Sequence, residues 1–407
     1  MKKLNFIIKC GLALLLLSFY SCESWLNVTP SDRLSEKMLF NDREGFVKAL
    51  NGVYIELNTN ELYGRNLTAG ALDVMGQYYS VASSSHAFYN YGGLVYTGND
   101  EKALFDNMWQ KCYAVIACCN TIIEKCDENK AGLSPVWRGS IKGEALALRA
   151  MLHFDMLRLF GPLTSELDKE SIPYQTNSDQ TVTPLLSGSE VIGLILDDLK
   201  NAVGLLKDTD PYFVEEEFSD TDLNYRRFRM NYFAAKGLMA RVQIWGGDKE
   251  KAAATAKEVI AEGQAEGAEF FPFVTNSEAT SSNPDRVFYS EVLFGTYHSS
   301  REKLHEDLFA PTLESTSILT LAGTARRDDL YDNENDYRYS VWSTYNKNGT
   351  SVLYHRKFEK QDNVTASRQY MIPLIRLVFS VKRTSVICVW KWISPPHTRI
   401  FSRIFLI

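Results

Sequence analysis

The sequence predicts a mainly α-helical protein, in which a tetratricopeptide-like scaffold of helical repeats carries long irregular loops and a few short β-strands. Three observations predict this class. Apolar residues recur every three or four positions over much of the chain, which is the spacing of one buried helix face. One helix pair, residues 231–262, is joined by two glycines in the manner of a helical repeat unit. Two long stretches have another composition: 73–100 is rich in glycine, serine and aromatic residues, and 270–345 mixes short β-like runs with polar loops.

Composition limits the class of protein further. The chain has 407 residues, of which 45% are hydrophobic and 12% aromatic, and its formal net charge is −6. This is enough apolar material for a large core, so the chain is expected to be globular and not disordered. We expect no nucleic-acid partner for this acidic chain.

The first 21 residues have the order of an export signal. Three lysines precede the apolar run 11–17, which is far shorter than the roughly 20 residues of a membrane-spanning helix. Ser21-Cys22 follows the leucine-rich stretch, as in signals whose cysteine receives a lipid. We therefore expect residues 1–21 to be removed and Cys22 to become the lipid anchor. Cleavage nearby and a plain thiol are the alternatives.

Six helices follow from the apolar spacing and from local start and stop signals. For example, Ser134 and Pro135 suit the first turn of a helix, and Gly161-Pro162 ends it. The expected helices are Asp42–Leu57, Glu101–Cys126, Pro135–Phe160, Gly188–Leu206, Asn231–Trp245 and Asp248–Glu262.

The last two of these helices form the clearest repeat unit. Gly246-Gly247 can adopt the left-handed backbone that ends a helix, and the carboxylate of Asp248 can cap the next one. Small alanine and glycine residues lie where the two helices would approach closely, with bulky aliphatic residues beside them. Several such pairs, stacked through the middle of the chain, would form a solenoid-like scaffold.

Cysteine usage predicts neither a disulfide scaffold nor a metal cluster. Seven cysteines are few for a chain of this length, and Cys112, Cys119 and Cys126 recur every seven residues, with Cys118 beside them. A metal cluster would favour close cysteine pairs with histidines or further cysteines nearby, and this spacing is absent. We expect these thiols to be small buried groups in a helix seam.

Motifs for catalysis are absent from the sequence, and we expect the protein not to be an enzyme. It contains no H-E-x-x-H, Walker loop, G-x-S-x-G or dinucleotide fingerprint. His153 falls within an apolar helix, where a satisfied core histidine is the better interpretation. Asp197 and Asp198 are adjacent and point to different sides of their helix, and no facing carboxylate pair is indicated elsewhere. A carbohydrate-active enzyme is the least favoured alternative.

The acidic stretch 328–340 is the one candidate for a metal site. It holds five carboxylates and two asparagines, of which Asp332, Glu334 and Asp336 are the candidate oxygen ligands for calcium. The stretch lacks the spacing and the glycine of an EF-hand, so a solvated loop is the better interpretation. We expect no cofactor, with calcium as the alternative.

The loop 73–100 is the main candidate binding surface. Its aromatic residues are too many to lie under one loop, and amide and carboxylate groups stand beside them. Flat rings stack on the C–H faces of sugars, while sugar hydroxyls need hydrogen-bonding partners. An aromatic cluster packed on the helices is the alternative for each residue. The candidate glycan-binding residues are Asp73, Gln77, Tyr78, Tyr79, Phe88, Tyr89, Asn90, Tyr91 and Tyr96, with Trp342 and Tyr345 as second-tier candidates.

Four segments, in order along the chain, resemble the SusD/RagB-type outer-membrane nutrient-binding lipoproteins of Bacteroidetes. The mature N-terminus of that family is similar to SCESWLNVTPSDRLSEKMLFNDREGFVKALNGVY, residues 21–54. A family helix that ends in Arg-Leu-Phe-Gly is similar to GEALALRAMLHFDMLRLFGPL, residues 143–163. Its tetratricopeptide hairpin is similar to MARVQIWGGDKEKAAATAKEVI, and the segment before its final helix to YMIPLIRL, residues 370–377.

This resemblance implies a SusD-like, mainly helical fold and a non-enzymatic lipoprotein that is anchored to the outer membrane by its N-terminal lipid and exposed on the cell surface. Such a protein would bind an oligosaccharide or polysaccharide and pass it to a SusC-like TonB-dependent transporter. In relatives, aromatic residues on loops of the scaffold contact the sugar, and loop 73–100 lies in the corresponding region. A structural or assembly lipoprotein that holds a protein partner through its helical repeats is the alternative.

The expected organisation is a signal peptide, 1–21, an incomplete SusD-like domain, 22–377, and a tail, 378–407. The domain comprises an N-terminal part, 22–206, and a part that contains the hairpin, 226–377. The tail departs from the family, because no aspartate or glutamate follows Asp362 and basic and apolar residues crowd its end. We expect a truncation or frameshift after about Leu377, with a genuine basic tail as the alternative. Translation of the other two reading frames beyond codon 377 would decide.

Overall fold

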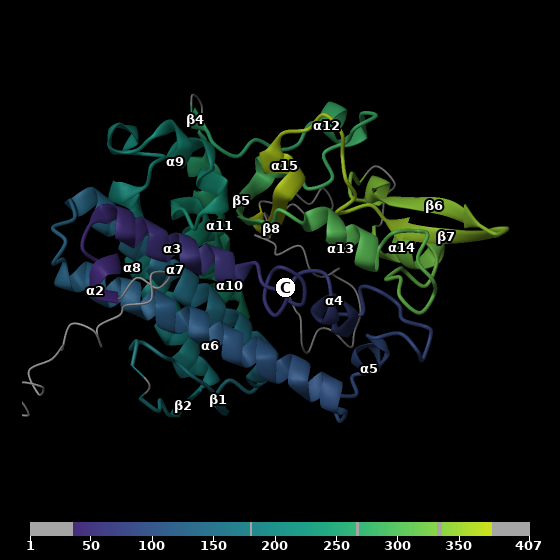
Figure 1. Cartoon of the computed structure of the whole chain (residues 1–407), viewed down its shortest axis with the longest axis horizontal. Helices are drawn as coiled ribbons and strands as arrows, with labels where there is room; N and C mark the ends of the chain where they lie inside the picture. The colour runs from purple at the N-terminus through teal and green to yellow at the C-terminus, as the bar shows by residue number, and fades with distance from the viewer. Residues whose placement is uncertain (1–35, 180, 266–267, 332–335, 377–407) are drawn as a thin grey trace, which may run out of the picture.

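The computed structural model describes residues 36–179, 181–265, 268–331 and 336–376, and Figure 1 shows how they are arranged. Long helices dominate these ranges, which confirms the predicted mainly α-helical class. The predicted signal segment with Cys22, the acidic residues Asp332 and Glu334, and the tail 378–407 lie outside the described residues. In the described part, no helix combines the length and the apolar character that crossing a membrane requires.

The long helices all lie in the first two thirds of the chain, with short helices and two short strands between them, and only short helices and strands follow. The helices are α2 (Glu36–Leu39), α3 (Arg43–Leu57), α4 (Ala71–Met75), α5 (Tyr89–Gly92), α6 (Asn99–Glu128), α7 (Pro135–Phe160), α8 (Gly188–Thr209), α9 (Asp220–Asn224), α10 (Tyr232–Trp245), α11 (Lys249–Gly263), α12 (Asn276–Thr280), α13 (Arg301–Leu308), α14 (Thr324–Leu330) and α15 (Ala366–Tyr370). The strands are β1 (Glu170–Pro173), β2 (Leu185–Ser187), β3 (Gln264–Ala265), β4 (Ala268–Glu269), β5 (Val292–Tyr297), β6 (Trp342–Lys347), β7 (Thr350–His355) and β8 (Met371–Arg376). They pair as antiparallel two-stranded sheets, β1 with β2, β3 with β4, β5 with β8 and β6 with β7.

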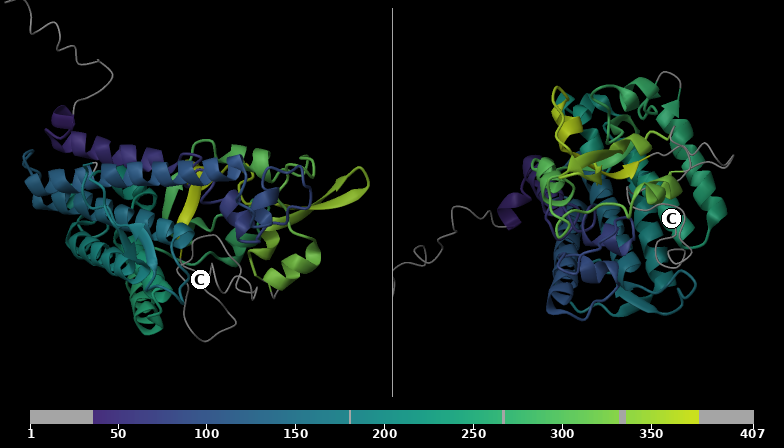
Figure 2. Two further views of the ribbon diagram at one scale, coloured as in Figure 1. Left: turned by 90° about the horizontal axis from the view of Figure 1, so that it is seen from below. Right: turned by 90° about the vertical axis from the view of Figure 1, so that its right-hand side faces the viewer.

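The long helices stack in chain order. Helix α6 packs on α7, α7 on α8, α8 on α10 and α10 on α11, while α3 lies against α6 and α7. Figures 1 and 2 show α3 and α6 running side by side, and in Figure 1 the green and yellow strands lie past the end of the shorter α3. This arrangement is the stacked helical scaffold that the sequence predicts.

Local signals place the helix ends close to their predicted positions, since no end differs by more than three residues. The Ser134 side chain accepts a hydrogen bond from the Trp137 N–H and so caps α7. Gly247 has a φ of +89°, in the left-handed region that favours glycine, and the Asp248 carboxylate accepts from the Lys251 N–H at 3.0 Å. The joint between α10 and α11 is therefore built as expected.

Two glycines let α7 and α8 approach closely. A Cβ atom on Gly139 would lie 2.6 Å from Thr209 Cγ2, and one on Gly143 would lie 2.7 Å from Leu206 Cγ. Both distances are shorter than carbon atoms can approach without a shift of the backbone or the side chain. The spacing of these two glycines, one helical turn apart, thus sets the contact between the two helices.

The cysteines of α6 behave as packing residues. Cys112, Cys119 and Cys126 are buried and form no disulfide, and Cys118 is exposed. Burial raises the pKa of the Cys126 thiol to about 12, so this thiol stays protonated at neutral pH. The prediction that these residues fill a helix seam is confirmed for the three that recur every seven positions.

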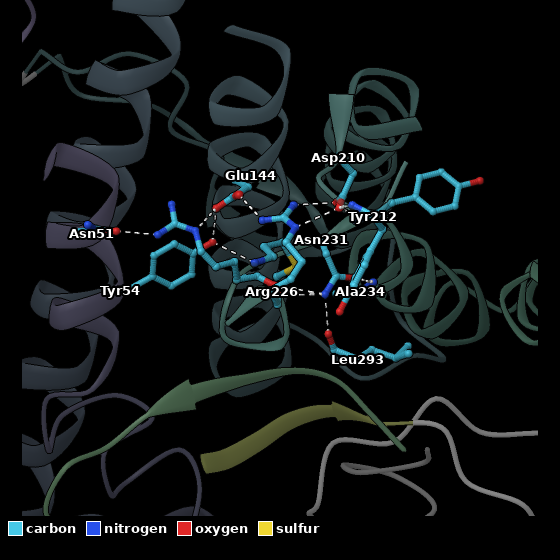
Figure 3. Close-up of polar contacts among 12 residues, drawn as sticks. Asn51, Tyr54, Glu144, Asp210, Tyr212, Arg226, Asn231, Ala234 and Leu293 are labelled. Carbon is cyan, nitrogen blue, oxygen red and sulfur yellow. Dashed lines mark hydrogen bonds and ion pairs between the residues drawn. The ribbon is translucent and has the colours of Figure 1, made fainter. Parts of the chain in front are cut away.

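A buried ion-pair network ties the scaffold together (Figure 3). Arg226, in the short helix η3 (Arg226–Phe228), is 1% exposed and donates to both carboxylate oxygens of Asp210, at 3.0 and 2.6 Å, and to Glu144. Glu144 also accepts from the Tyr54 hydroxyl at 2.6 Å and from Arg229 Nε at 3.0 Å. The network therefore connects α3, α7, the segment after α8 and η3.

Asn231 carries this connection on to the C-terminal strands, as Figure 3 also shows. Its side-chain oxygen accepts from the Ala234 N–H at 2.9 Å and caps α10. Its side-chain nitrogen donates to the Leu293 carbonyl of β5 at 2.6 Å. The β5–β8 sheet is thereby held against the helical scaffold.

Candidate functional site

A hollow of about 730 Å³ lies between the loop that follows α4 and the beginning of α14. This volume falls within the roughly 300 to 1,000 Å³ that is usual for small-molecule sites. Figure 1 shows α4, α5 and α14 in the same half of the molecule. The lining residues, called the cleft below, are Gln77, Tyr78, Tyr79, Ser80, Val81, Tyr89, Asn90, Gly92, Gly93, Leu94, Val95, Ala322 and Arg326.

Two tight bends shape the wall of the cleft that spans residues 77–95. Gln77 follows the end of α4 with a φ of +52°, and Leu94 follows α5 with a φ of +54°. Residues other than glycine rarely adopt this conformation, and such strained positions concentrate at functional sites. The Gln77 side-chain nitrogen donates to the Gly92 carbonyl at 2.8 Å, which fastens one bend to the other.

An aromatic layer supports this wall from behind. The Tyr78 and Tyr331 hydroxyls lie 2.6 Å apart, and the Tyr79 hydroxyl lies 2.8 Å from Nδ1 of His355. The ring of Trp342 stacks on His355 with centroids 4.3 Å apart and an interplanar angle of 13°. Burial raises the pKa of both Tyr78 and Tyr79, so their hydroxyls remain neutral hydrogen-bonding groups. The wall is thus fixed by residues more than two hundred positions away.

The backbone adds one direct link between the two walls. The Ser80 N–H donates to the Thr320 carbonyl at 2.7 Å, just before the second wall with Ala322 and Arg326. This hydrogen bond ties the first wall to the segment that leads into the second wall.

The open face of the cleft presents one ring and two amides. The Tyr89 side chain is 43% exposed, and Gln77 and Asn90 are exposed on the same wall. The Asn90 side-chain nitrogen donates to Glu101 Oε1 at 2.9 Å, which orients the amide. An accessible ring beside fixed amide groups is the combination that binds a sugar through stacking and hydrogen bonds.

The structure divides the predicted glycan-binding residues into two groups. Gln77, Tyr78, Tyr79, Tyr89 and Asn90 come together in the cleft lining. The others lie elsewhere: Phe88, Tyr91 and Trp342 are buried in the core, Tyr96 packs on Phe105, Tyr345 is exposed on the β6–β7 hairpin, and Asp73 is buried in α4. For the buried rings this is the packing arrangement that the sequence left open as the alternative.

Asp73 has an electrostatic role inside the protein. Its side chain is 1% exposed, and its negative charge favours the ammonium form of the buried Lys357. Burial nevertheless lowers the pKa of Lys357 to about 8. Asp73 is therefore placed to stabilise a buried charge behind the cleft and not to contact a ligand within it.

Sequence reasoning missed the second wall of the cleft. The lining residues Ser80, Val81 and 92–95 lie inside the predicted loop but are not among its candidate binding residues. Arg326 lies in an ordinary charged helix, TARRDDL, and no local pattern marks it as a ligand-binding residue. Arg326 lines the cleft only because the fold places α14 next to loop 73–100.

Metal-binding geometry is not found among the described residues. They contain no group of three or more histidine, cysteine, aspartate or glutamate side chains that could hold a metal ion. Asp336 instead pairs with Arg338, whose Nε lies 2.9 Å from Asp336 Oδ1. The other two candidate calcium ligands, Asp332 and Glu334, fall in the part that the structure does not describe.

Comparison with known proteins gives consistent results. A SusD-like family model, described as "Starch-binding associating with outer membrane", matches residues 24–243. SusD-like protein P2 of Formosa agariphila is 25% identical over 265 residues, which are 63% of this chain and 46% of that protein. A SusD-like protein of Bacteroides ovatus is 29% identical over 146 residues, 35% of this chain and 23% of that protein. The chain therefore spans half or less of the length of these relatives.

Solved structures share the fold. A SusD-like carbohydrate-binding protein from Bacteroides vulgatus aligns with a TM-score of 0.61 and 20% identity, over 83% of this chain and 69% of that chain. A SusD superfamily protein from Bacteroides thetaiotaomicron aligns with a TM-score of 0.63 and 19% identity, over 82% of this chain and 73% of that chain. At this identity the likeness establishes the fold alone.

Proposed function

The chain belongs to the SusD-like family, and from this we propose that it is a cell-surface glycan-binding lipoprotein that captures oligosaccharides in the cleft and passes them to a SusC-like TonB-dependent outer-membrane transporter. The family model is described as starch-binding and associated with the outer membrane, which supports this class of ligand and this location. The proposed anchor is a lipid on Cys22. Palmitate labelling of the wild-type and Cys22→Ala proteins tests that step.

One observation carries the proposal for the binding site. Loop 73–100, which the sequence predicts to bind sugar, forms one wall of the cleft. It presents Tyr89 with Gln77 and Asn90 beside it. A sugar ring that stacks on Tyr89 would place its hydroxyls within reach of the amides. In the part of the chain that the structure describes, no facing acid pair is seen at the cleft, so the proposed role is binding without hydrolysis.

Affinity electrophoresis against a panel of polysaccharides tests this function. We expect the wild-type protein to be retarded by at least one polysaccharide without release of sugar. Tyr89→Ala should weaken that retardation about tenfold, since the loss of a central aromatic contact commonly costs more than 1 kcal/mol. The matched control is Tyr345→Ala, because Tyr345 is also 43% exposed but lies on the β6–β7 hairpin and does not line the cleft.

The results separate the competing functions. Equal weakening by Tyr89→Ala and Tyr345→Ala would contradict the cleft as the binding site. Released sugars would indicate an enzyme. The burial of Phe88, Tyr91 and Trp342 favours the structural or assembly role as second candidate, and absence of retardation by every polysaccharide would support it.

A further inference from the structure

Charge is distributed unevenly over the cleft. Among its lining residues, all of which lie in the described part of the chain, Arg326 is the one charged side chain. It is half-buried in α14 and belongs to the second wall, which comes from a segment far along the chain from the Tyr89 loop. The formal charge that a ligand meets on the cleft lining is therefore positive.

The Arg326 guanidinium is available to a ligand. Within the ranges that the structure describes, no hydrogen bond or ion pair engages its side chain. The adjacent Arg327 differs, because its guanidinium lies 4.0 Å from the ring centroid of Tyr339 and its Nε lies 3.3 Å from Asp328 Oδ1. An arginine offers a planar fork of N–H donors that fits the oxygens of carboxylates and of tetrahedral anions.

Three carboxylates near the cleft are either engaged by other groups or buried behind its wall, and the exposed Asp329 of α14 does not line it. Asp328 accepts from the Tyr339 hydroxyl at 2.9 Å in addition to its contact with Arg327. Glu101 is buried and accepts from the Asn90 amide. Asp73 is buried behind the wall, so none of these three negative charges lies on the cleft lining beside Arg326.

The charge of the whole chain makes this local feature easy to test. The formal net charge is −6, so the protein as a whole repels polyanions, and unspecific attraction to them is not expected. Preferential retention of an acidic glycan would consequently report a local cationic contact. Hydrogen bonds from arginine to an ionised group are stronger than hydrogen bonds between neutral groups. One such contact can therefore favour an acidic glycan over a neutral one.

We propose that the cleft selects acidic glycans, in which a carboxylate or sulfate group binds the Arg326 guanidinium while a neighbouring sugar ring stacks on Tyr89. This inference rests on the proposed function of the cleft and narrows its ligand to sugars that carry anionic oxygens. The Gln77 and Asn90 amides then bind the uncharged hydroxyls.

Paired polysaccharides with one backbone and different charge provide the test. Polygalacturonate is compared with its highly methyl-esterified form for carboxylates, and dextran sulfate with dextran for sulfates. The wild-type chain should be retarded more strongly by the acidic member of at least one pair. Arg326→Gln should weaken that retention by about tenfold or more and leave retention by the neutral member unchanged. The matched control, Arg327→Gln, should behave as wild type, since Arg327 does not line the cleft.

Each other result overturns the inference in a recognisable way. Stronger retention by the neutral members would overturn acidic selectivity and leave the proposed glycan-binding function standing. Acidic retention that survives Arg326→Gln, or that falls equally with Arg327→Gln, would remove Arg326 from the site. If none of the polysaccharides retains the protein, both proposals are overturned. Equal thermal midpoints for the three proteins show that the variants are folded.

Discussion

Burial decides the chemistry of single residues in this protein, and His153 illustrates this. Its Nε2 accepts a hydrogen bond from the Gln175 N–H at 3.0 Å, so the ring proton lies on Nδ1, which is 3.0 Å from the Arg149 carbonyl. The ring stacks on Tyr174 with centroids 4.0 Å apart. Burial lowers the pKa of His153 to about 3, so the residue is a neutral core histidine, as the sequence predicts.

This pKa predicts acid sensitivity. His153 has an ordinary pKa of about 6.5 in the unfolded chain and binds a proton there before it does in the folded protein. Its contribution to stability is therefore complete above pH 6.5 and is lost as the pH falls from about 6.5 toward about 3. When the pH is lowered from 7.5 to 5, protonation of His153 in the unfolded chain should reduce the free energy of unfolding by about 2 kcal/mol.

Urea unfolding of wild type and His153→Gln at both pH values checks this prediction. Glutamine keeps an acceptor and a donor but does not titrate. The loss of stability on acidification should be smaller in the variant by about 2 kcal/mol. His305, whose pKa burial lowers to about 4, remains in both proteins and therefore cancels in the comparison. An identical pH dependence would show that His153 does not titrate in this way.

Close packing decides the geometry of the helical elements, and the contact between α7 and α8 depends on missing side chains. Gly143 lies where a methyl group would meet Leu206, whereas Gly204 on the exposed side of α8 has no atom within 4 Å of an added Cβ. Both positions are helical glycines, so intrinsic helix propensity favours alanine at each. Their tertiary surroundings differ, because an added methyl group would clash at Gly143 and would meet open space at Gly204.

Two alanine substitutions separate propensity from packing. Gly204→Ala should stabilise the protein by up to about 1 kcal/mol, because alanine restricts the unfolded chain and adds no clash. Gly143→Ala should destabilise it by about 1 to 3 kcal/mol through overpacking against Leu206. Chemical denaturation midpoints measure both effects. Stabilisation by both substitutions would mean that α8 moves away at no cost.

Long-range polar contacts join the molecule as a whole. Arg226 bridges Glu144 of α7 and Asp210 after α8, with side-chain exposures of 2%, 4% and 0%. Charges this deeply buried are stable only while each has its partner. The network therefore couples the packing of α3, α7 and η3, and through Asn231 the β5–β8 sheet, into one cooperative unit.

Removal of the central cation tests this coupling. Arg226→Met should destabilise the protein by about 3 to 5 kcal/mol, since it leaves Asp210 buried without its ion pair and Glu144 with fewer partners. The matched control is Asp307→Asn, which breaks the exposed pair between Lys303 and Asp307 and should leave the urea midpoint unchanged. A similar small effect from both substitutions would contradict a structural role for the network.

The cleft also belongs to the scale of the whole molecule. Its aromatic wall comes from loop 73–100, its support from Tyr331, Trp342 and His355, and its cation from α14. These segments are far apart in sequence, so they come together only through the packing of the whole scaffold. Local patterns cannot report it.

The sequence by itself determined the helical class, the six long helices and the loop that forms the Tyr89 wall, because apolar spacing, caps such as Ser134 and Asp248, and turn residues act over a few positions. Tertiary structure alone decided which rings of that loop face solvent. Tyr89 is exposed whereas Tyr79 and Tyr91 are buried, since burial depends on what the rest of the chain places against each ring. The same physical reason explains why Arg326 joined the cleft without any local signal: a binding site is a meeting of distant segments, and only the packed fold brings them together.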